Sequence, residues 1–151
     1  MHGHGGRLGP GRDGVRRQEA TIDRDGVLEK AATHASAIGK SLLTQFPSDM
    51  RTDHLKRYGT ARLTRRTITD ARVLSDTLER LTCNQPVFDL REYANKTVCS
   101  AVGVNTGTEA GSLALAMPLA DAHRLKHATH TLARKAIPVL LTLLISGGIT
   151  L

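Results

Sequence analysis

The sequence predicts an α/β fold in which an antiparallel sheet carries flanking helices. Two segments, 97–104 and 110–117, alternate bulky and small residues as strands do, and the Asn- and Gly-containing connection between them predicts a hairpin. A long helical pattern at 120–146 follows, and shorter helical patterns precede the strands. With 151 residues, 40% of them hydrophobic, the chain has the size and composition of one domain.

Three helices are predicted before these strands. Ser36 is a suitable N-cap for a helix whose apolar side chains recur at every fourth residue. A short helix at 49–57 follows, with Gly59 closing it. Asp70 or the residue before it then begins a helix with leucines on one side and charged residues on the other, spaced for i, i+4 ion pairs. Pro86 ends that helix.

Each predicted strand of the hairpin has a bulky face and a small face. If the small faces align, the sheet leaves room above it for a closely packed helix or for a bound molecule, and close helix packing is the commoner case. A brief strand or the start of a loop is predicted just before the hairpin, at 87–89. The small faces consist of Thr97, Cys99, Ala101 and Gly103 in the first strand and of Ser112, Ala114 and Ala116 in the second.

The two ends of the chain differ from its middle. Residues 1–21 are rich in Gly and Arg and have little to bury, which predicts a disordered tail ahead of one domain at 22–151. Beyond Ile137 the last helix is apolar almost all round, which predicts burial on two sides and a contact between subunits. Pro138 is expected to kink or break that helix. No apolar run reaches the ~20 residues of a membrane span, so no membrane partner is expected.

The formal net charge of +7 invites a nucleic-acid interpretation. The excess is local, since five basic residues and no acid lie between Lys56 and Arg66. Only 3% of the residues are aromatic, Tyr58 is the single aromatic residue in that stretch, and no helix carries base-reading side chains. A solvated basic face is therefore favoured. The two cysteines form no CxxC pair, which predicts no disulfide framework and fits a reduced cytoplasm.

No motif predicts catalysis or a cofactor. The run Gly-Lys-Ser at 39–41 resembles the end of a phosphate-binding loop, but His34 stands where that loop needs a glycine. No serine or cysteine is framed by the signature of a nucleophile. The helix start at 35–39 has small residues, free N–H groups and a dipole that favours an anion. A carboxylate could dock there, or Ser36 could simply cap the helix.

No metal site is predicted, although three histidines share one face of the last helix. Arg124 stands where a zinc-protease helix would carry Glu. The same face lies opposite the leucine stripe and carries Arg134, so a solvated face is favoured. The histidines are His123, His127 and His130.

Four segments resemble, in order and spacing, the IclR family of bacterial transcriptional regulators. They are 33–43 (THASAIGKSLL, similar to hATaxGKalLa), 63–69 (LTRRTIT, similar to lTprTit), 88–92 (FDLRE) leading to 98–102 (VCSAV), and 113–118 (LALAMP, similar to alsisgP). The resemblance covers about residues 25–148. It implies a GAF-like effector domain of α/β form, which binds a small, often carboxylate-bearing metabolite and signals to an N-terminal winged helix-turn-helix.

The resemblance also implies a ligand site. Small residues at a helix start would offer N–H groups to the carboxylate of the ligand, and polar residues and a strand would line the pocket. Two alanines on that strand cannot donate hydroxyl hydrogen bonds, so a less polar effector, or weak binding, is expected. Lys96 stands where the family commonly has glycine, and Arg91 where it commonly has an acid. The implied ligand-binding residues are Ala37, Ile38, Gly39, Asp89, Thr97, Cys99, Ala114 and Ala116.

The winged helix-turn-helix has no counterpart in this sequence, and the Gly/Arg segment stands where the first helix and strands of the effector domain are expected. The chain is therefore expected to be an N-terminally truncated effector domain. Its expected partners are a small-molecule effector and further copies of itself, with DNA reached only through the missing module. The alternative is a degenerate domain that acts only as an oligomerisation partner. An enzyme on a GAF-like scaffold is the least favoured interpretation.

Overall fold

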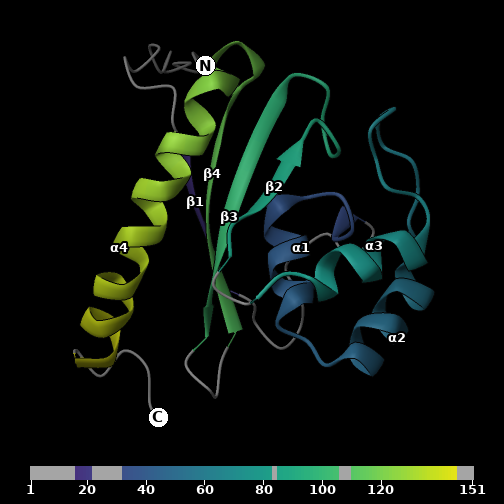
Figure 1. Ribbon diagram of the computed structural model, residues 1–151, viewed down its shortest axis with the longest axis horizontal. Helices are drawn as coiled ribbons and strands as arrows, with labels where there is room; N and C mark the ends of the chain where they lie inside the picture. Colours follow the sequence, from purple (N-terminus) through teal and green to yellow (C-terminus); the bar gives the residue numbers. More distant parts are fainter. Residues whose placement is uncertain (1–15, 22–31, 83–84, 106–109, 146–151) are drawn as a thin grey trace, which may run out of the picture.

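A computed structural model describes residues 16–21, 32–82, 85–105 and 110–145. In these residues, four strands form one antiparallel sheet in the order β1-β4-β3-β2. The sheet lies between α4 on one side and α1, α2 and α3 on the other (Figure 1). The elements are β1 (Arg16–Thr21), α1 (Ala37–Thr44), α2 (Ser48–Tyr58), α3 (Ala71–Glu79), β2 (Val87–Leu90), β3 (Thr97–Asn105), β4 (Ala110–Pro118), the 3₁₀ helix η2 (Leu119–Arg124) and α4 (Leu125–Ile145).

The two faces of the sheet are packed differently, as the strand pattern predicts. On the bulky face, Val98 and Met117 form a core with Leu125 at the start of α4. On the small face, Ala101 and Ala114 pack against Ala37 at the start of α1. Small side chains let a helix approach a sheet closely, so the small residues of β3 and β4 explain why α1 lies directly on the sheet.

The helix boundaries follow from local capping. The Ser36 side chain accepts a hydrogen bond from the amide of Gly39 (3.0 Å), and Asp70 accepts from the amides of the first turn of α3. Gly59 ends α2 with φ of 72°, a conformation that glycine adopts without strain. The second and third helices pack on the first through a core of their own rather than on the sheet: Leu43, Leu55, Leu74 and Leu78, with Phe46, Ile68 and Leu81 beside them.

The prediction of a disordered tail is wrong for residues 16–21, because Arg16–Thr21 form the strand β1. It pairs with β4 over its whole length, from Arg16 opposite Ala116 to Thr21 opposite Gly111. An edge strand is held by backbone hydrogen bonds to its neighbour, and these need no apolar side chains. Residues 1–15 lie outside the described part of the chain.

Two expectations for the helices also differ from the structure. The ion pairs expected on α3 are not formed: among the described residues the ion pairs are Lys40–Glu92 and Asp53–Arg57. Exposed charges gain little by pairing and lose side-chain entropy. Of the two outcomes expected at Pro138, the break is wrong, since α4 continues to Ile145, and the kink stays a prediction. Within the described residues, no helix is long and apolar enough to cross a membrane.

Candidate functional site

Three of the predicted site residues form one row across the small face of the sheet. Asp89 of β2 lies opposite Cys99 of β3, and Cys99 lies opposite Ala116 of β4. Residues that face each other in antiparallel strands project to the same side, with Cβ atoms about 4.5–5.5 Å apart. The register therefore brings an acid, a thiol and an alanine together on the side of the sheet that carries α1.

The start of α1 lies beside this row. Ala37 packs on Ala114 of the neighbouring row, and Ile38 and Cys99 pack against the same cluster. Thr97 lies two residues before Cys99 and so on the same face, opposite Pro118. Of the eight predicted residues, seven thus share one face of the sheet and the helix start above it. Gly39 has a different role.

The first helix covers only part of the small face. Ala101 and Ala114, below the helix, are buried. By contrast, four predicted site residues keep part of their surface exposed: Ile38, Thr97, Cys99 and Ala116. The room above the small face is thus divided. The helix covers the part near Ala114, and Thr97, Cys99 and Ala116, nearer the turn between β2 and β3, are less completely covered.

The amides at the start of α1 are not all free. Gly39 donates to the Ser36 side chain, and the amide of Lys40 donates to the Ser36 carbonyl (3.0 Å). For the amides of Ala37 and Ile38, the described part of the chain provides no acceptor. These two amides, at the positive end of the helix dipole, are the donors that an anion could use. Ser36 therefore caps the helix through the amide of Gly39, while the amides of Ala37 and Ile38 are the ones that could bind an anion.

Gly39 is required for packing instead. A Cβ atom at this position would lie 2.3 Å from the carbonyl oxygen of Thr33 and 2.7 Å from Oγ of Ser36. These distances are far below van der Waals contact, so only glycine fits between the helix and the preceding turn. The structure does not place Gly39 among the donors available to a ligand.

Asp89 is buried, with 1% of its surface exposed, and it organises the turn that follows β2. Its Oδ1 accepts hydrogen bonds from the amides of Glu92 (2.7 Å) and Tyr93 (3.2 Å). This turn includes Arg91, which has φ of 70°. Burial raises the pKa of Asp89 above its ordinary value, and the two amide hydrogen bonds and the charge of Lys40 offset part of that increase.

Replacing Asp89 with asparagine is expected to change how stability depends on pH. An amide Oδ1 still accepts both backbone hydrogen bonds but carries no charge to desolvate. Because the folded-state pKa is raised, the wild type should lose stability relative to Asp89→Asn as the pH rises above 3.8, the ordinary pKa of Asp, and passes the folded-state pKa. Denaturation at a series of pH values measures the difference. Parallel stability curves for the two proteins would contradict it.

The Cys99 thiol is kept neutral. Burial raises its pKa to about 11, and the nearby charge of Asp89 acts in the same direction. A thiol with so high a pKa is a poor nucleophile, because the thiolate is the reactive form. Cys99 thus offers a weakly polar surface to the site rather than a reactive group.

Sequence reasoning missed Lys40 and Glu92. Lys40 is 5% exposed, and its Nζ donates to the carbonyl of Phe88 (2.6 Å) and forms an ion pair with the Glu92 carboxylate. It thereby ties α1 to the end of β2. The run Gly-Lys-Ser drew attention to this lysine as a possible phosphate ligand, whereas its ammonium group is already bound. One feature of the sequence could have indicated a buried lysine: Lys40 lies between Gly39 and Leu42, in a helix whose residues are mostly buried.

Two threonines of the segment before α3 hold the same turn from the other side. The hydroxyl of Thr64 donates to the carbonyl of Arg91 (2.6 Å), and that of Thr67 donates to the carbonyl of Glu92 (2.7 Å). Both threonines are buried. The turn after Asp89 is therefore fixed by side chains from α1, from β2 and from the segment at 62–67.

Ser112, the serine of the small face, is already hydrogen-bonded to α1. The Ser112 hydroxyl donates to Oγ of Ser41 in α1 (3.1 Å), and both residues are buried. Gln45 at the end of α1 donates to the carbonyl of Gly111 (2.8 Å). These contacts attach the C-terminal half of α1 to β4, away from the partly open row.

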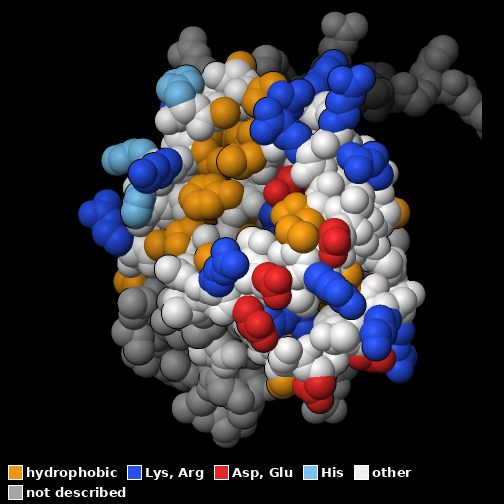
Figure 2. Space-filling view, turned by 45° about the vertical axis from the view of Figure 1, so that its right-hand side comes forward, with side chains coloured by type: hydrophobic (Ala, Val, Ile, Leu, Met, Phe, Trp, Pro, Cys, Tyr) orange, Lys and Arg blue, Asp and Glu red, His pale blue; other side chains and the backbone are white. Residues whose placement is uncertain are grey.

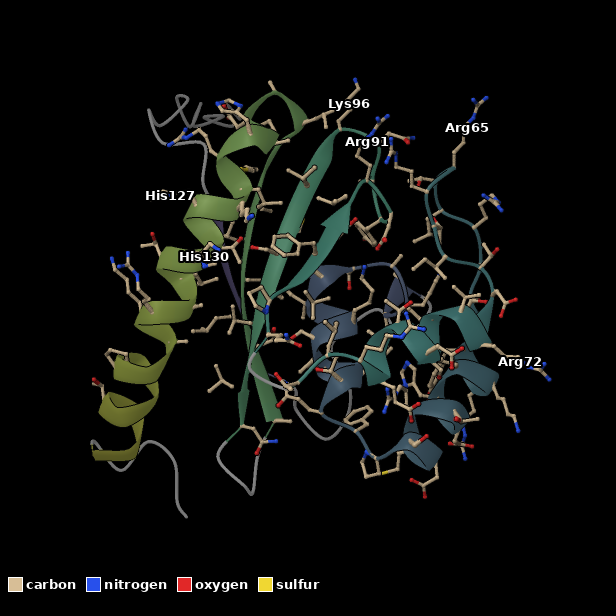
Figure 3. All side chains as sticks on the ribbon, in the orientation of Figure 1. Arg65, Arg72, Arg91, Lys96, His127 and His130 are labelled. Atoms are coloured by element: carbon tan, nitrogen blue, oxygen red, sulfur yellow. The ribbon has the colours of Figure 1, made fainter. Side chains whose placement is uncertain are left out.

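The histidines of the last helix are exposed. Figure 3 shows His127 and His130 on α4, far from the turn that carries Arg91. Across the described ranges, no group of three or more His, Cys, Asp or Glu side chains could hold a metal ion.

Solved structures similar to this chain include domains of transcription regulators. The C-terminal domain of the E. coli transcriptional regulator KdgR is 26% identical, with a TM-score of 0.58 over 72% of this chain and 70% of that one. A double mutant of the PobR inducer binding domain from Acinetobacter, in complex with 3-hydroxybenzoic acid, is 24% identical, with a TM-score of 0.64 over 72% of this chain and 64% of that one. IclR of Thermotoga maritima is 22% identical, with a TM-score of 0.65 over 74% of this chain.

This chain spans 47% of the length of the Thermotoga protein, so it corresponds to about half of that regulator. No curated protein matches the sequence. The family described as bacterial transcriptional regulator IclR C-terminal matches residues 26–137, most of the chain. The protein therefore belongs to the IclR family of bacterial transcriptional regulators and matches the C-terminal domain of that family.

Proposed function

We propose that this domain senses a small organic acid and biases the conformation of an oligomeric regulator of transcription. The observation that carries the proposal is the row of buried Asp89 and partly exposed Cys99 and Ala116, which lies beside the amides of Ala37 and Ile38, and these amides have no acceptor among the described residues. The carboxylate of the acid would bind at these amides, and its apolar part would lie over Cys99 and Ala116. DNA would be contacted by a winged helix-turn-helix, and the regulator would act in the cytoplasm.

The lining favours an acid with few further polar groups. Ala114 and Ala116 donate no hydrogen bonds, and the hydroxyl of Ser112 is engaged with α1. Thr97, Cys99 and the carboxyl of Asp89 are the remaining polar groups of the predicted set. Aromatic and aliphatic monocarboxylates are therefore the first probes, and the 3-hydroxybenzoic acid bound to the PobR domain supports that choice.

The substitution Ala116→Leu tests the proposal. Ala116 is partly exposed on the small face, so a larger side chain at this position should take up space above the sheet without disturbing the core. A thermal-shift and calorimetric screen should find an aromatic or aliphatic carboxylate that binds the unmodified domain. Ala116→Leu should then weaken that binding at least tenfold, by occupying the volume of the ligand.

The matched control is Ala71→Leu, on the exposed start of α3 and away from the sheet. It makes the same change of volume and should leave binding unchanged. Absence of binding across the panel would overturn the sensing function. So would a carboxylate that binds Ala116→Leu and the unmodified domain equally well.

A second candidate function is subunit association, and an apolar band favours it. Among the described residues, β2 is the outer strand of the sheet next to β3, and Leu90 on it is 50% exposed. On the same face, Phe88 and three residues of η2 and α4 are only partly buried: Ala122, Ala128 and Leu132. Figure 2 shows a band of hydrophobic side chains running beside pale-blue histidines. A partner copy covering this band would explain a domain that associates without binding an effector.

A further inference from the structure

Arg51 of α2 is a buried cation without a partner. Only 6% of its surface is exposed, and its Nε and Nη1 atoms are buried with no acceptor among the described residues. Lys40 is buried to a similar degree, but it is bound by the Phe88 carbonyl and the Glu92 carboxylate. An unpaired buried charge is strongly destabilising, so the guanidinium of Arg51 requires an anion that the described part of the chain does not supply.

The acidic residues of α2 do not neutralise Arg51. Asp49 and Asp53 each lie two residues from Arg51, and two residues turn a helix by about 200°, so both project from the opposite side of α2. Asp53 forms its ion pair with Arg57 (2.9 Å), and both of these side chains are exposed. Within the described ranges, no residue forms an ion pair with Arg51.

The start of α2 offers further donors beside this cation. Pro47 is the N-cap and provides no side-chain hydrogen bond, and the amide of Arg51 donates to the Pro47 carbonyl (3.0 Å). The three amides before it, those of Ser48, Asp49 and Met50, have no acceptor among the residues that the structure describes. They lie at the positive end of the dipole of an 11-residue helix, which favours an anion.

Helix geometry directs the Arg51 side chain toward these amides. Helical side chains lean toward the N-terminus of their helix and cover the preceding turn. Arg51 is the fourth residue of α2, so the preceding turn is the one that contains Pro47 and Ser48. A cation over the positive end of a helix is unfavourable, and one anion would compensate both charges. The buried guanidinium without a partner and the uncapped helix start therefore indicate the same kind of ligand.

We propose that the start of α2 binds the phosphate group of a small metabolite, held by the guanidinium of Arg51 and by the amides of Ser48, Asp49 and Met50. The guanidinium and the three amides offer donors in several directions. Such a set suits the three terminal oxygens of a phosphate group better than the two coplanar oxygens of a carboxylate. The site is separate from the proposed effector site, because α2 packs on α1 and α3 through a core of its own (Figure 1).

The first test titrates inorganic phosphate into the isotopically labelled domain and follows the amide NMR signals, with sodium chloride added to keep the ionic strength constant. The amide signals of Ser48, Asp49 and Met50 should shift and saturate at about millimolar phosphate. The amides of the first turn of α3, which Asp70 already caps, should not shift. Acetate should require at least a tenfold higher concentration for the same change.

The second test measures melting temperatures of variants. Arg51→Met keeps an aliphatic stem and removes the unpaired charge, so without phosphate it should melt no lower than the unmodified domain. At a phosphate concentration about a hundredfold above the dissociation constant, the unmodified domain should gain about 5–10 °C. Arg51→Met should gain only the small increase that phosphate gives to proteins in general. The matched control Arg72→Met removes an exposed arginine at the start of α3 and should keep the full gain.

Two results would overturn this inference. One is a set of amide signals at Ser48, Asp49 and Met50 that does not move with phosphate, and the other is an equal gain in melting temperature for Arg51→Met and the unmodified domain. The NMR titration uses the unmodified domain, so it decides the question even if Arg51→Met does not fold. Because the two sites are separate, either result would leave the proposed sensing function standing.

Discussion

Gly39→Ala is expected to destabilise the domain by about 3 kcal/mol, the upper range for forcing one extra methyl group into a packed interior. The added Cβ would lie 2.3 Å from the carbonyl oxygen of Thr33 and 2.6 Å from its Cα, and both are backbone atoms that cannot rotate away. In an open helix the same substitution stabilises, because alanine has the higher helix propensity. Chemical denaturation monitored by circular dichroism measures the sign and the size of the change.

Gly111→Ala is the matched control. Gly111 lies in β4, where the nearest atom to an added Cβ is the carbonyl oxygen of Val104 at 3.7 Å, an ordinary contact. Its stability should change by less than about 0.5 kcal/mol. If both variants were equally stable, Gly39 would not be a packing residue. If Gly39→Ala kept its stability and lost only its affinity for a carboxylate, Gly39 would be a ligand-binding residue after all.

The elements that could be predicted are those with a local cause. Ser36 and Asp70 cap their helices with their own side chains, so the start of α1 and of α3 is encoded within four residues. The alternation of bulky and small residues in β3 and β4 is likewise local, and the structure confirms both strands and the face that each presents. In such elements, the residues that form the sequence pattern are the same residues that cap the helix or pack against the sheet.

The elements that could not be predicted depend on distant partners. Strand β1 is held by β4, whose paired residues lie 90 to 100 positions further along the chain, and nothing in the polar run Arg-Arg-Gln-Glu indicates a strand. Lys40 has its partners 48 and 52 residues further on, at Phe88 and Glu92. A contact of that kind leaves no periodic pattern in the sequence, so the ion pair of Lys40 could not be predicted from it.

The candidate site combines both kinds of information. The resemblance to the IclR family selected Asp89, Cys99 and Ala116, and the strand register places them in one row. How far α1 covers the small face could not be predicted, because the coverage depends on two hydrogen bonds between the helix and β4. Ser112 donates one to Ser41, and Gln45 donates the other to the carbonyl of Gly111. Those bonds hold α1 over Ala114 and leave the neighbouring row partly open. The roles of Asp89, Cys99 and Ala116 in ligand binding stay predictions.

Lys40→Met is expected to cost about 3 kcal/mol of stability, the lower end of the range for removing one partner of a buried ion pair. Methionine fills a similar volume, so the loss comes from the Glu92 carboxylate and the Phe88 carbonyl, which would stay buried without their donor. The side chain of Glu92 keeps 17% of its surface exposed, so part of its charge can be rehydrated, and this places the cost at the lower end. Denaturant unfolding at pH 7 measures the change.

Two further variants separate the buried pair from charge in general. Arg57→Met breaks the exposed pair with Asp53 and should change stability by less than about 0.5 kcal/mol, because both side chains are already hydrated. Lys40→Met/Glu92→Leu removes both buried charges and should regain most of the loss, since an apolar pair of similar volume needs no desolvation. If the double variant were as unstable as Lys40→Met, the lysine would stabilise the fold through its contact with Phe88 rather than through Glu92. In that case the link from α1 to the turn after Asp89 would run through the backbone of β2 alone.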